Sequence, residues 1–173
     1  MQARLVILSA AQCLAPLAAP AQSVKDEGGL RFDGALIQSC LDNGGWRDCI
    51  GVATNACIEA TPGGYSTVGM TGCTVAEEEW WDARLNAEYR ALMERERAGD
   101  ADWQPIPGML PRPSGAEALR TAQRAWIAWR DATCAYEELQ WWGGTGASGA
   151  GAGCRMRLTA EQVLALMSYQ AEG

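Results

Sequence analysis

The chain of 173 residues is long enough for one domain with a buried core. Its 21 acidic and 14 basic side chains give a formal net charge of −7, and it contains no histidine. A negative surface repels phosphate backbones and anionic lipids, so nucleic-acid and membrane-surface partners are not expected, and histidine-dependent catalytic triads are excluded.

The first 21 residues have the pattern of a secretory signal peptide. One early charge, Arg4, precedes an apolar stretch over residues 5–17, and Ala19-Pro20-Ala21 places small residues before a cleavage site. The apolar stretch is too short to span a bilayer, and a buried N-terminal helix is the less favoured alternative. We expect a periplasmic or secreted mature protein that begins at Gln22, has no membrane insertion after cleavage, and carries a net charge of −8 once Arg4 is lost.

The cysteines favour a disulfide framework. One of the seven, Cys13, falls in the predicted signal peptide, and an even set of six in an exported chain is typical of disulfide bonding. No two of them form a CxxC pair, so neither a zinc site nor any other metal or cofactor is expected. Six cysteines allow fifteen pairings. Proximity along the chain favours three of them: Cys40–Cys49, Cys57–Cys73 and Cys134–Cys154.

The N-terminal third is predicted to be irregular with short helices. Residues 22–35 resemble a flexible leader, and a single helical domain is predicted over 36–173. The Asn43-Gly44-Gly45 break should separate two short helices, of which the second covers about 46–60. The segment 61–73, with its Pro-Gly-Gly sequence, is predicted to be a loop.

A longer helix is predicted from Thr74 to about Arg97. Thr74 is a good N-cap, Glu77 lies three residues later as in a capping box, and Gly99 is expected to end the helix. Glu77–Glu79 would occupy the first turn, where the helix dipole favours carboxylates; consecutive residues point apart, which argues against a pair of glycosidase carboxylates. An apolar stripe at helical spacing supports this helix: Trp81, Leu85, Tyr89 and Leu92.

Two further helices are predicted after an extended, proline-rich connector over 99–115. Ser114 is the expected N-cap of a helix that runs to about Trp142. The glycine-rich segment 143–153 is predicted to be a flexible linker, because it has no GK[ST] sequence and follows no strand. Thr159 is the expected cap of the last helix. No segment alternates as a strand, so the fold class is all-α: a small disulfide-bridged helical bundle with long irregular loops.

Trp126, Arg130 and Cys134 are spaced four residues apart and so lie on one face of the second long helix. This face could be an exposed aromatic and cationic patch that binds a sugar or carboxylate. The favoured interpretation is structural: Trp126 is in the core, Cys134 is bridged, and Arg130 reaches a carboxylate on the facing helix. Asp82 is the candidate partner, since Asp131 points elsewhere on its own helix.

Two stretches in order, "WWDARLNAEYRALM" and "LRTAQRAWIAWRDATC", resemble the LprI-like lysozyme-inhibitor family of small exported bacterial proteins. The resemblance covers about residues 57–169. It implies a non-enzymatic binding protein, with a cationic lysozyme-type protein as the possible partner. The motif positions are expected to be structural: Asp82, Leu85, Asn86, Tyr89, Gln123, Trp126, Arg130 and Asp131.

Three other functions remain open. The chain could be a cell-wall carbohydrate-binding module, because exposed aromatic side chains pack against sugar faces. It could instead be a purely structural envelope protein, or an enzyme that uses carboxylates without histidine. The tryptophans outside the predicted core stripes are the candidates for sugar contacts: Trp46, Trp103, Trp141 and Trp142.

Overall fold

The structure of the protein, a computed structural model, describes residues 29–171. The predicted signal peptide over 1–21 and the first part of the predicted leader lie outside the described residues. The described part of the chain contains five α-helices and one 3-10 helix, η1, and it has no strand, which confirms the predicted all-α, disulfide-bridged fold. The elements are α1 (Ala35–Asp42), η1 (Trp46–Cys49), α2 (Val52–Ala60), α3 (Thr67–Asp102), α4 (Gly115–Leu139) and α5 (Ala147–Ala171).

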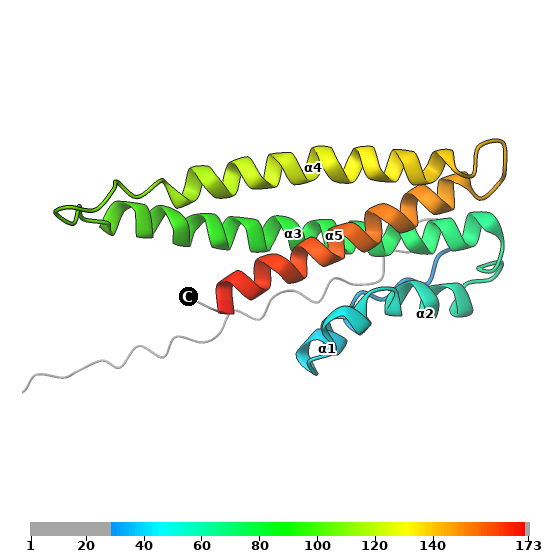
Figure 1. Cartoon of the computed structure of the whole chain (residues 1–173). Coiled ribbons are helices and arrows are strands. Elements are labelled where there is room, and N and C mark those ends of the chain that lie inside the picture. Colours follow the sequence, from blue (N-terminus) through cyan, green and yellow to red (C-terminus); the bar gives the residue numbers. More distant parts are fainter. Residues whose placement is uncertain (1–28, 172–173) are drawn as a thin grey trace, which may run out of the picture.

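Helix α3 is the long element on which the others assemble. It forms an antiparallel hairpin with α4, and α5 crosses both (Figure 1). Helix α2 packs at the N-terminal half of α3, and α1 packs against η1 and α2. The core where these elements meet includes Ile37, Ala53, Trp81, Leu85, Leu92, Met156, Ala160, Val163 and Leu166. Phe32, inside the segment predicted as a leader, also packs against this core.

Helix α3 begins earlier and ends later than predicted. Ser66, in the extended conformation, is the N-cap, and its hydroxyl accepts a hydrogen bond from the Gly69 N–H at 3.0 Å. A Cβ on Gly69 would collide with the backbone of Gly63 and Gly64, so glycine lets the preceding turn fold tightly against the first turn of the helix. The predicted cap, Thr74, is inside the helix and donates its hydroxyl proton to the Met70 carbonyl.

Glu77 has a different role from the predicted one: it caps helix α2. Its carboxylate accepts hydrogen bonds from the backbone N–H groups of Gly51 and Thr54, both at 2.6 Å, and from the Trp81 indole at 3.0 Å. Glu77 and Trp81 are both fully buried. Gly51, the N-cap of α2, has a φ of +92° and no side chain to supply a cap. Glu77 therefore supplies from α3 the acceptor and the negative charge that the N-terminus of α2 lacks.

The glycine-rich segment is mostly helical, so its prediction as a flexible linker was wrong. Helix α5 starts at Ala147, and Thr159, the predicted cap, is a fully buried residue in its middle. A Cβ on Gly149 would lie 3.3 Å from the Thr71 hydroxyl, and one on Gly151 would lie 2.6 Å from a carboxylate oxygen of Glu138. The small residues allow α5 to approach α3 and α4 closely, and this packing outweighs the low helix propensity of glycine.

Three disulfide bonds link neighbouring elements, in the pairs favoured by proximity along the chain: Cys40–Cys49, Cys57–Cys73 and Cys134–Cys154. The first joins α1 to η1, the second joins α2 to α3, and the third joins α4 to α5. Each bond lies across a turn between two consecutive elements. The turns are therefore restrained covalently, whereas the contacts between distant elements depend on packing.

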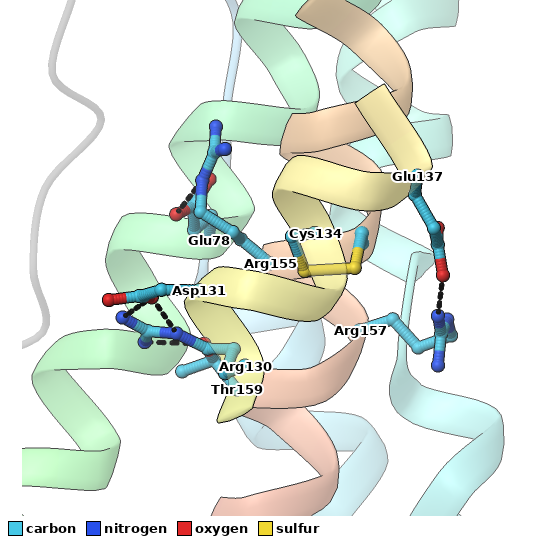
Figure 2. The surroundings of a disulfide bond; sticks show 9 residues. Glu78, Arg130, Asp131, Cys134, Glu137, Arg155, Arg157 and Thr159 are labelled. Atoms are coloured by element: carbon cyan, nitrogen blue, oxygen red, sulfur yellow. Dashed lines mark hydrogen bonds and ion pairs between the residues drawn. A yellow bond between two sulfur atoms is a disulfide. The ribbon is translucent and has the colours of Figure 1, made fainter. Parts of the chain in front are cut away.

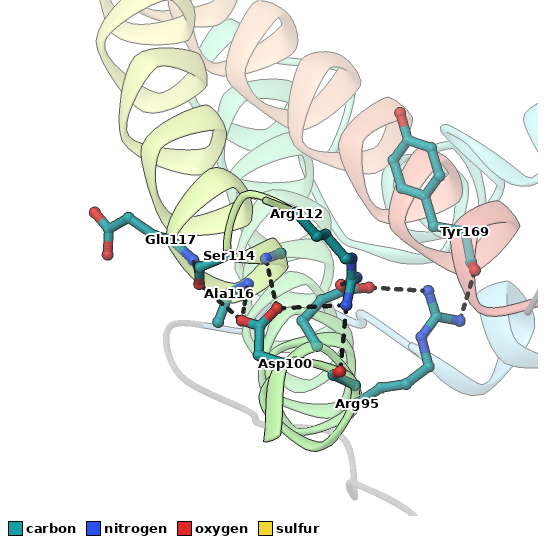
Figure 3. A network of polar contacts seen from close by, with 10 residues as sticks. Arg95, Asp100, Arg112, Ser114, Ala116, Glu117 and Tyr169 are labelled. Atoms are coloured by element: carbon teal, nitrogen blue, oxygen red, sulfur yellow. Dashed lines mark hydrogen bonds and ion pairs between the residues drawn. The ribbon is translucent and has the colours of Figure 1, made fainter. Parts of the chain in front are cut away.

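The open end of the hairpin is held by Asp100, on the last turn of α3 (Figure 3). Its carboxylate accepts hydrogen bonds from the Ser114 hydroxyl at 2.7 Å and from the N–H groups of Gly115 at 2.8 Å and Ala116 at 3.1 Å. The Ser114 oxygen in turn accepts from the Glu117 N–H, which confirms Ser114 as the N-cap of α4. The hydrogen bond from Ser114 is the main reason that the pKa of Asp100 lies below its usual value of 3.8, with the two backbone bonds adding to it.

We predict that Glu77→Gln lowers the free energy of unfolding by about 2–3 kcal/mol, because the amide offers one oxygen in place of two charged acceptors. Thermal and urea unfolding of the oxidised protein would measure this loss. The matched control is Glu79→Gln, two residues along the same helix and exposed, with an expected change within about 0.5 kcal/mol. Equal effects of the two substitutions would contradict the capping role of Glu77.

We predict that Asp100→Asn lowers the Tm at neutral pH and that this difference shrinks as the pH falls below 3.8. A carboxyl whose folded pKa is depressed contributes stability above its unfolded pKa, and that contribution is lost as the pH falls through the folded pKa. Melting curves of both proteins between neutral pH and about pH 2 test this. The exposed Asp102→Asn is the control, and a pH-independent difference for Asp100→Asn would contradict the prediction.

Candidate functional site

The motif residues of the two long helices face one another across a groove between α3 and α4. The groove has a volume of about 330 Å³. Four residues at helical spacing on α3 and six on α4 line it: Asp82, Leu85, Asn86, Tyr89, Arg120, Gln123, Arg124, Trp126, Ile127 and Arg130. Seven of the eight motif positions are among them; Asp131 is the exception. Arg120, Arg124 and Ile127 were missed as site residues. Arg120 and Ile127 lie three and four residues from Gln123, and Arg124 lies four residues from Arg120, so helical spacing could have indicated them.

The α3 wall of the groove is organised by Asn86. Its side-chain N–H group donates to the Asp82 carbonyl at 2.8 Å and to the Asp82 carboxylate at 3.0 Å. Both side chains are exposed, whereas Leu85 between them is buried. Asp82 is therefore held by a neighbour on its own helix and not by α4.

Arg130 has partners other than the predicted one, so the expected ion pair with Asp82 was wrong. Its Nε and Nη2 donate to a carboxylate oxygen of Asp131 at 3.0 and 2.8 Å, and its Nη1 donates to the Thr159 hydroxyl at 3.3 Å (Figure 2). The prediction that Asp131 cannot pair with Arg130 considered only the directions of the two Cβ atoms. The arginine side chain is long enough to fold back over the adjacent carboxylate.

Trp126 is half-buried and borders the groove, so its prediction as a core residue was only partly right. The guanidinium carbon of Arg130 lies 5.0 Å from the centroid of the Trp126 ring, a cation–π contact. Because the Arg130 side chain is only 16% exposed, this stack is well shielded from water. Arg130 thus fixes Trp126 at the edge of the groove while it contacts the buried Thr159 of α5.

The floor of the groove is buried, whereas its other two arginines are more exposed. Gln123 is buried, and its carbonyl oxygen accepts from the Gln162 amide at 3.1 Å. Arg120 forms an ion pair with Glu117, whose side chain is 61% exposed, and Arg124 is exposed. The ion pair between Arg120 and Glu117 contributes little stability, because both side chains are accessible to solvent.

A second candidate surface lies where α4 turns into α5. Four large side chains there are exposed, and we call them the aromatic turn: Tyr136 (63%), Leu139 (54%), Trp141 (59%) and Trp142 (85%). The Cys134–Cys154 bond fastens the two helices beside this turn (Figure 2). Solvent-exposed aromatic side chains on a restrained turn are suited to protein contact.

Ion pairs flank the same disulfide. Glu137 pairs with Arg157 at 3.1 Å, and Glu78 of α3 pairs with Arg155 of α5 at 3.0 Å (Figure 2). Burial raises the pKa of Glu78 above its usual value of 4.5, although the charge of Arg155 opposes the rise. The Glu78–Arg155 pair joins helices that are far apart in the sequence, next to the turn.

Neither a metal centre nor a membrane span is found in this part of the chain. Over residues 29–171 no group of three or more histidine, cysteine, aspartate or glutamate side chains is placed to hold a metal ion. Within the same residues no helix combines the length and apolarity needed to cross a bilayer.

The fold and these surfaces define a small all-helical, disulfide-bridged protein with a groove of mixed polar and apolar lining in its helical hairpin. Residues 57–166 match the family described as lysozyme inhibitor LprI, a match over more than half of the chain. The chain belongs to the LprI lysozyme inhibitor family, which confirms the resemblance seen in its two motifs. No curated protein and no solved structure matches it.

We predict that Arg130→Ala lowers the free energy of unfolding by about 1–3 kcal/mol, through loss of the Trp126 stack and the bond to Thr159. Asp131→Asn should cost less than about 0.5 kcal/mol, because the Asp131 side chain is 56% exposed. Double-mutant cycles, measured by chemical unfolding, would give the coupling energy of Arg130 with each of its partners separately. Stronger coupling of Arg130 to Asp82 than to Trp126 would contradict this assignment.

Proposed function

We propose that the protein is a non-enzymatic inhibitor of lysozyme-type muramidases that acts in the periplasm or outside the cell. Membership of the LprI family is the observation that carries the proposal. Three disulfide bonds, which form and persist in oxidising compartments, support export. The proposed partner is a strongly basic lysozyme.

Charge would bring the two proteins together. The whole chain has a net charge of −7, and the proposed mature form has one positive charge fewer. An acidic inhibitor and a basic enzyme attract one another over a distance of about a Debye length, which raises the association rate and makes it sensitive to salt. This attraction selects basic partners without fixing the contact surface.

The aromatic turn is the proposed contact surface. Tryptophan and tyrosine dominate the energetics of protein interfaces, and Trp142 is 85% exposed in the free protein. The Cys134–Cys154 bond restrains the turn before binding, so less conformational entropy is lost in the complex. The motif residues on α3 and α4 are proposed to support the fold and the groove, and not to contact lysozyme.

We predict that the oxidised mature protein slows lysis of bacterial cells by a basic lysozyme and that Trp142→Ser weakens inhibition about 30-fold, the loss expected of an interface hot spot. A turbidity assay gives the inhibition constants. The matched control is Leu110→Ser, which replaces a side chain that is 90% exposed in the connector at the other end of the hairpin. Added salt should reduce the association rate.

Two results would count against this proposal. Absence of both inhibition and complex formation with several basic lysozymes at micromolar concentration would remove the inhibitor function. Equal losses in Trp142→Ser and Leu110→Ser would keep inhibition but remove the aromatic turn as the contact surface.

A further inference from the structure

We propose that the groove between α3 and α4 is a binding site for a sugar acid, a hydroxylated ring that carries a carboxylate. Its volume of about 330 Å³ falls at the small end of the range of about 300–1,000 Å³ found for ligand pockets. A single sugar ring with one or two substituents fits such a volume.

The groove is lined by more positive than negative side chains, and two of its arginines are paired with carboxylates outside the lining, Glu117 and Asp131. Three arginines and one aspartate line it, whereas the chain as a whole carries 21 acidic and 14 basic side chains. The three arginines, Arg120, Arg124 and Arg130, all come from α4, and Asp82 comes from the opposite wall. A small cluster of guanidinium groups in an acidic protein favours an anion at this place, and guanidinium geometry matches a carboxylate.

Arg124 and Arg120 are the groups available to bind the carboxylate. They are one turn apart on α4, so their side chains can reach the same anion. Arg124 is exposed, and Arg120 can exchange its exposed partner Glu117 for a ligand at little cost. Arg130 is instead occupied by Asp131 and Thr159, so it acts as a positioning residue for Trp126.

The rest of the lining suits a hydroxylated ring. Tyr89 and Trp126 contribute aromatic side chains, and the C–H face of a sugar ring packs on the negatively polarised face of an aromatic ring. The Asn86 N–H group is bonded to Asp82, which leaves the Asn86 oxygen as an acceptor. The Gln123 oxygen is bonded to Gln162, which leaves its NH2 group as a donor. Hydroxyl groups can use both kinds of partner.

The groove is formed before a ligand arrives. Leu85 and Gln123 are buried beneath it, and the Arg130 contact with the fully buried Thr159 links its α4 wall to α5. A site whose side chains are already held by other contacts loses little entropy on binding. This inference rests on the groove alone and does not depend on lysozyme inhibition.

The test is calorimetric titration of the full mature, oxidised protein with N-acetylmuramic acid, glucuronic acid and N-acetylglucosamine. The first two carry a carboxylate from different sources, a cell-wall sugar and a uronic acid, and the third is a neutral control. We expect a Kd between about 0.1 and 1 mM for at least one sugar acid, and binding at least tenfold weaker for N-acetylglucosamine. Binding of one acid only would identify the source.

Arg124→Gln is expected to weaken sugar-acid binding at least tenfold and to leave the thermal melt unchanged, because its side chain is exposed. Arg97→Gln is the matched control: Arg97 is exposed on α3 and outside the groove. Equal binding of acid and neutral sugars, no effect of Arg124→Gln, or no saturable heat with either acid would overturn the proposal. Lysozyme is absent from this experiment, so a negative result leaves the proposed inhibition untouched.

Discussion

The structure depends on one buried carboxylate. Glu77 of α3 is fully buried and accepts two backbone hydrogen bonds from the start of α2 and one from the Trp81 indole. A buried charge without hydrogen bonds would cost several kcal/mol, so the position of α2 against α3 is fixed by the need to satisfy this group. Trp81, held in place by the same carboxylate, is the largest fully buried side chain in the core on which α1, α3 and α5 converge.

The two ends and the middle of the α3–α4 hairpin present different surfaces. Near the α4–α5 turn, the Cys134–Cys154 bond joins α4 to α5 and the Glu78–Arg155 pair joins α3 to α5, and large aromatic side chains are exposed there. At the opposite end Asp100 joins the two helices by capping α4. Between the two ends, α5 crosses the hairpin, and the motif side chains of α3 and α4 border a groove. Seven of the eight motif positions therefore line this groove, and the structural role expected of them stays a prediction.

Local patterns in the sequence were sufficient for some features. The all-α class, the Ser114 cap and the three disulfide pairs depend on residues close together in the chain, where short-range geometry decides. The start of α3 and the role of Glu77 were predicted wrongly. A glutamate three residues after a threonine indicates a capping box only if no distant hydrogen-bond donors, such as the N–H groups at the start of α2, compete for its carboxylate. The Arg130 partner was wrong for a similar reason: Thr159 was placed at a helix start, and in the structure it lies buried in the middle of α5.

The sequence by itself determined that this is a helical, disulfide-bridged chain with two motif-bearing long helices, since helix periodicity, caps and cysteine order are local properties. Only the tertiary structure decided that the glycine-rich segment belongs to α5, that Glu77 serves another helix, and that arginines of α4 face Asn86 and Tyr89 across a groove. These features follow from close approach between elements far apart in the chain. Such packing outweighs the local helix propensity, and it cannot be predicted from the residue pattern of a single helix.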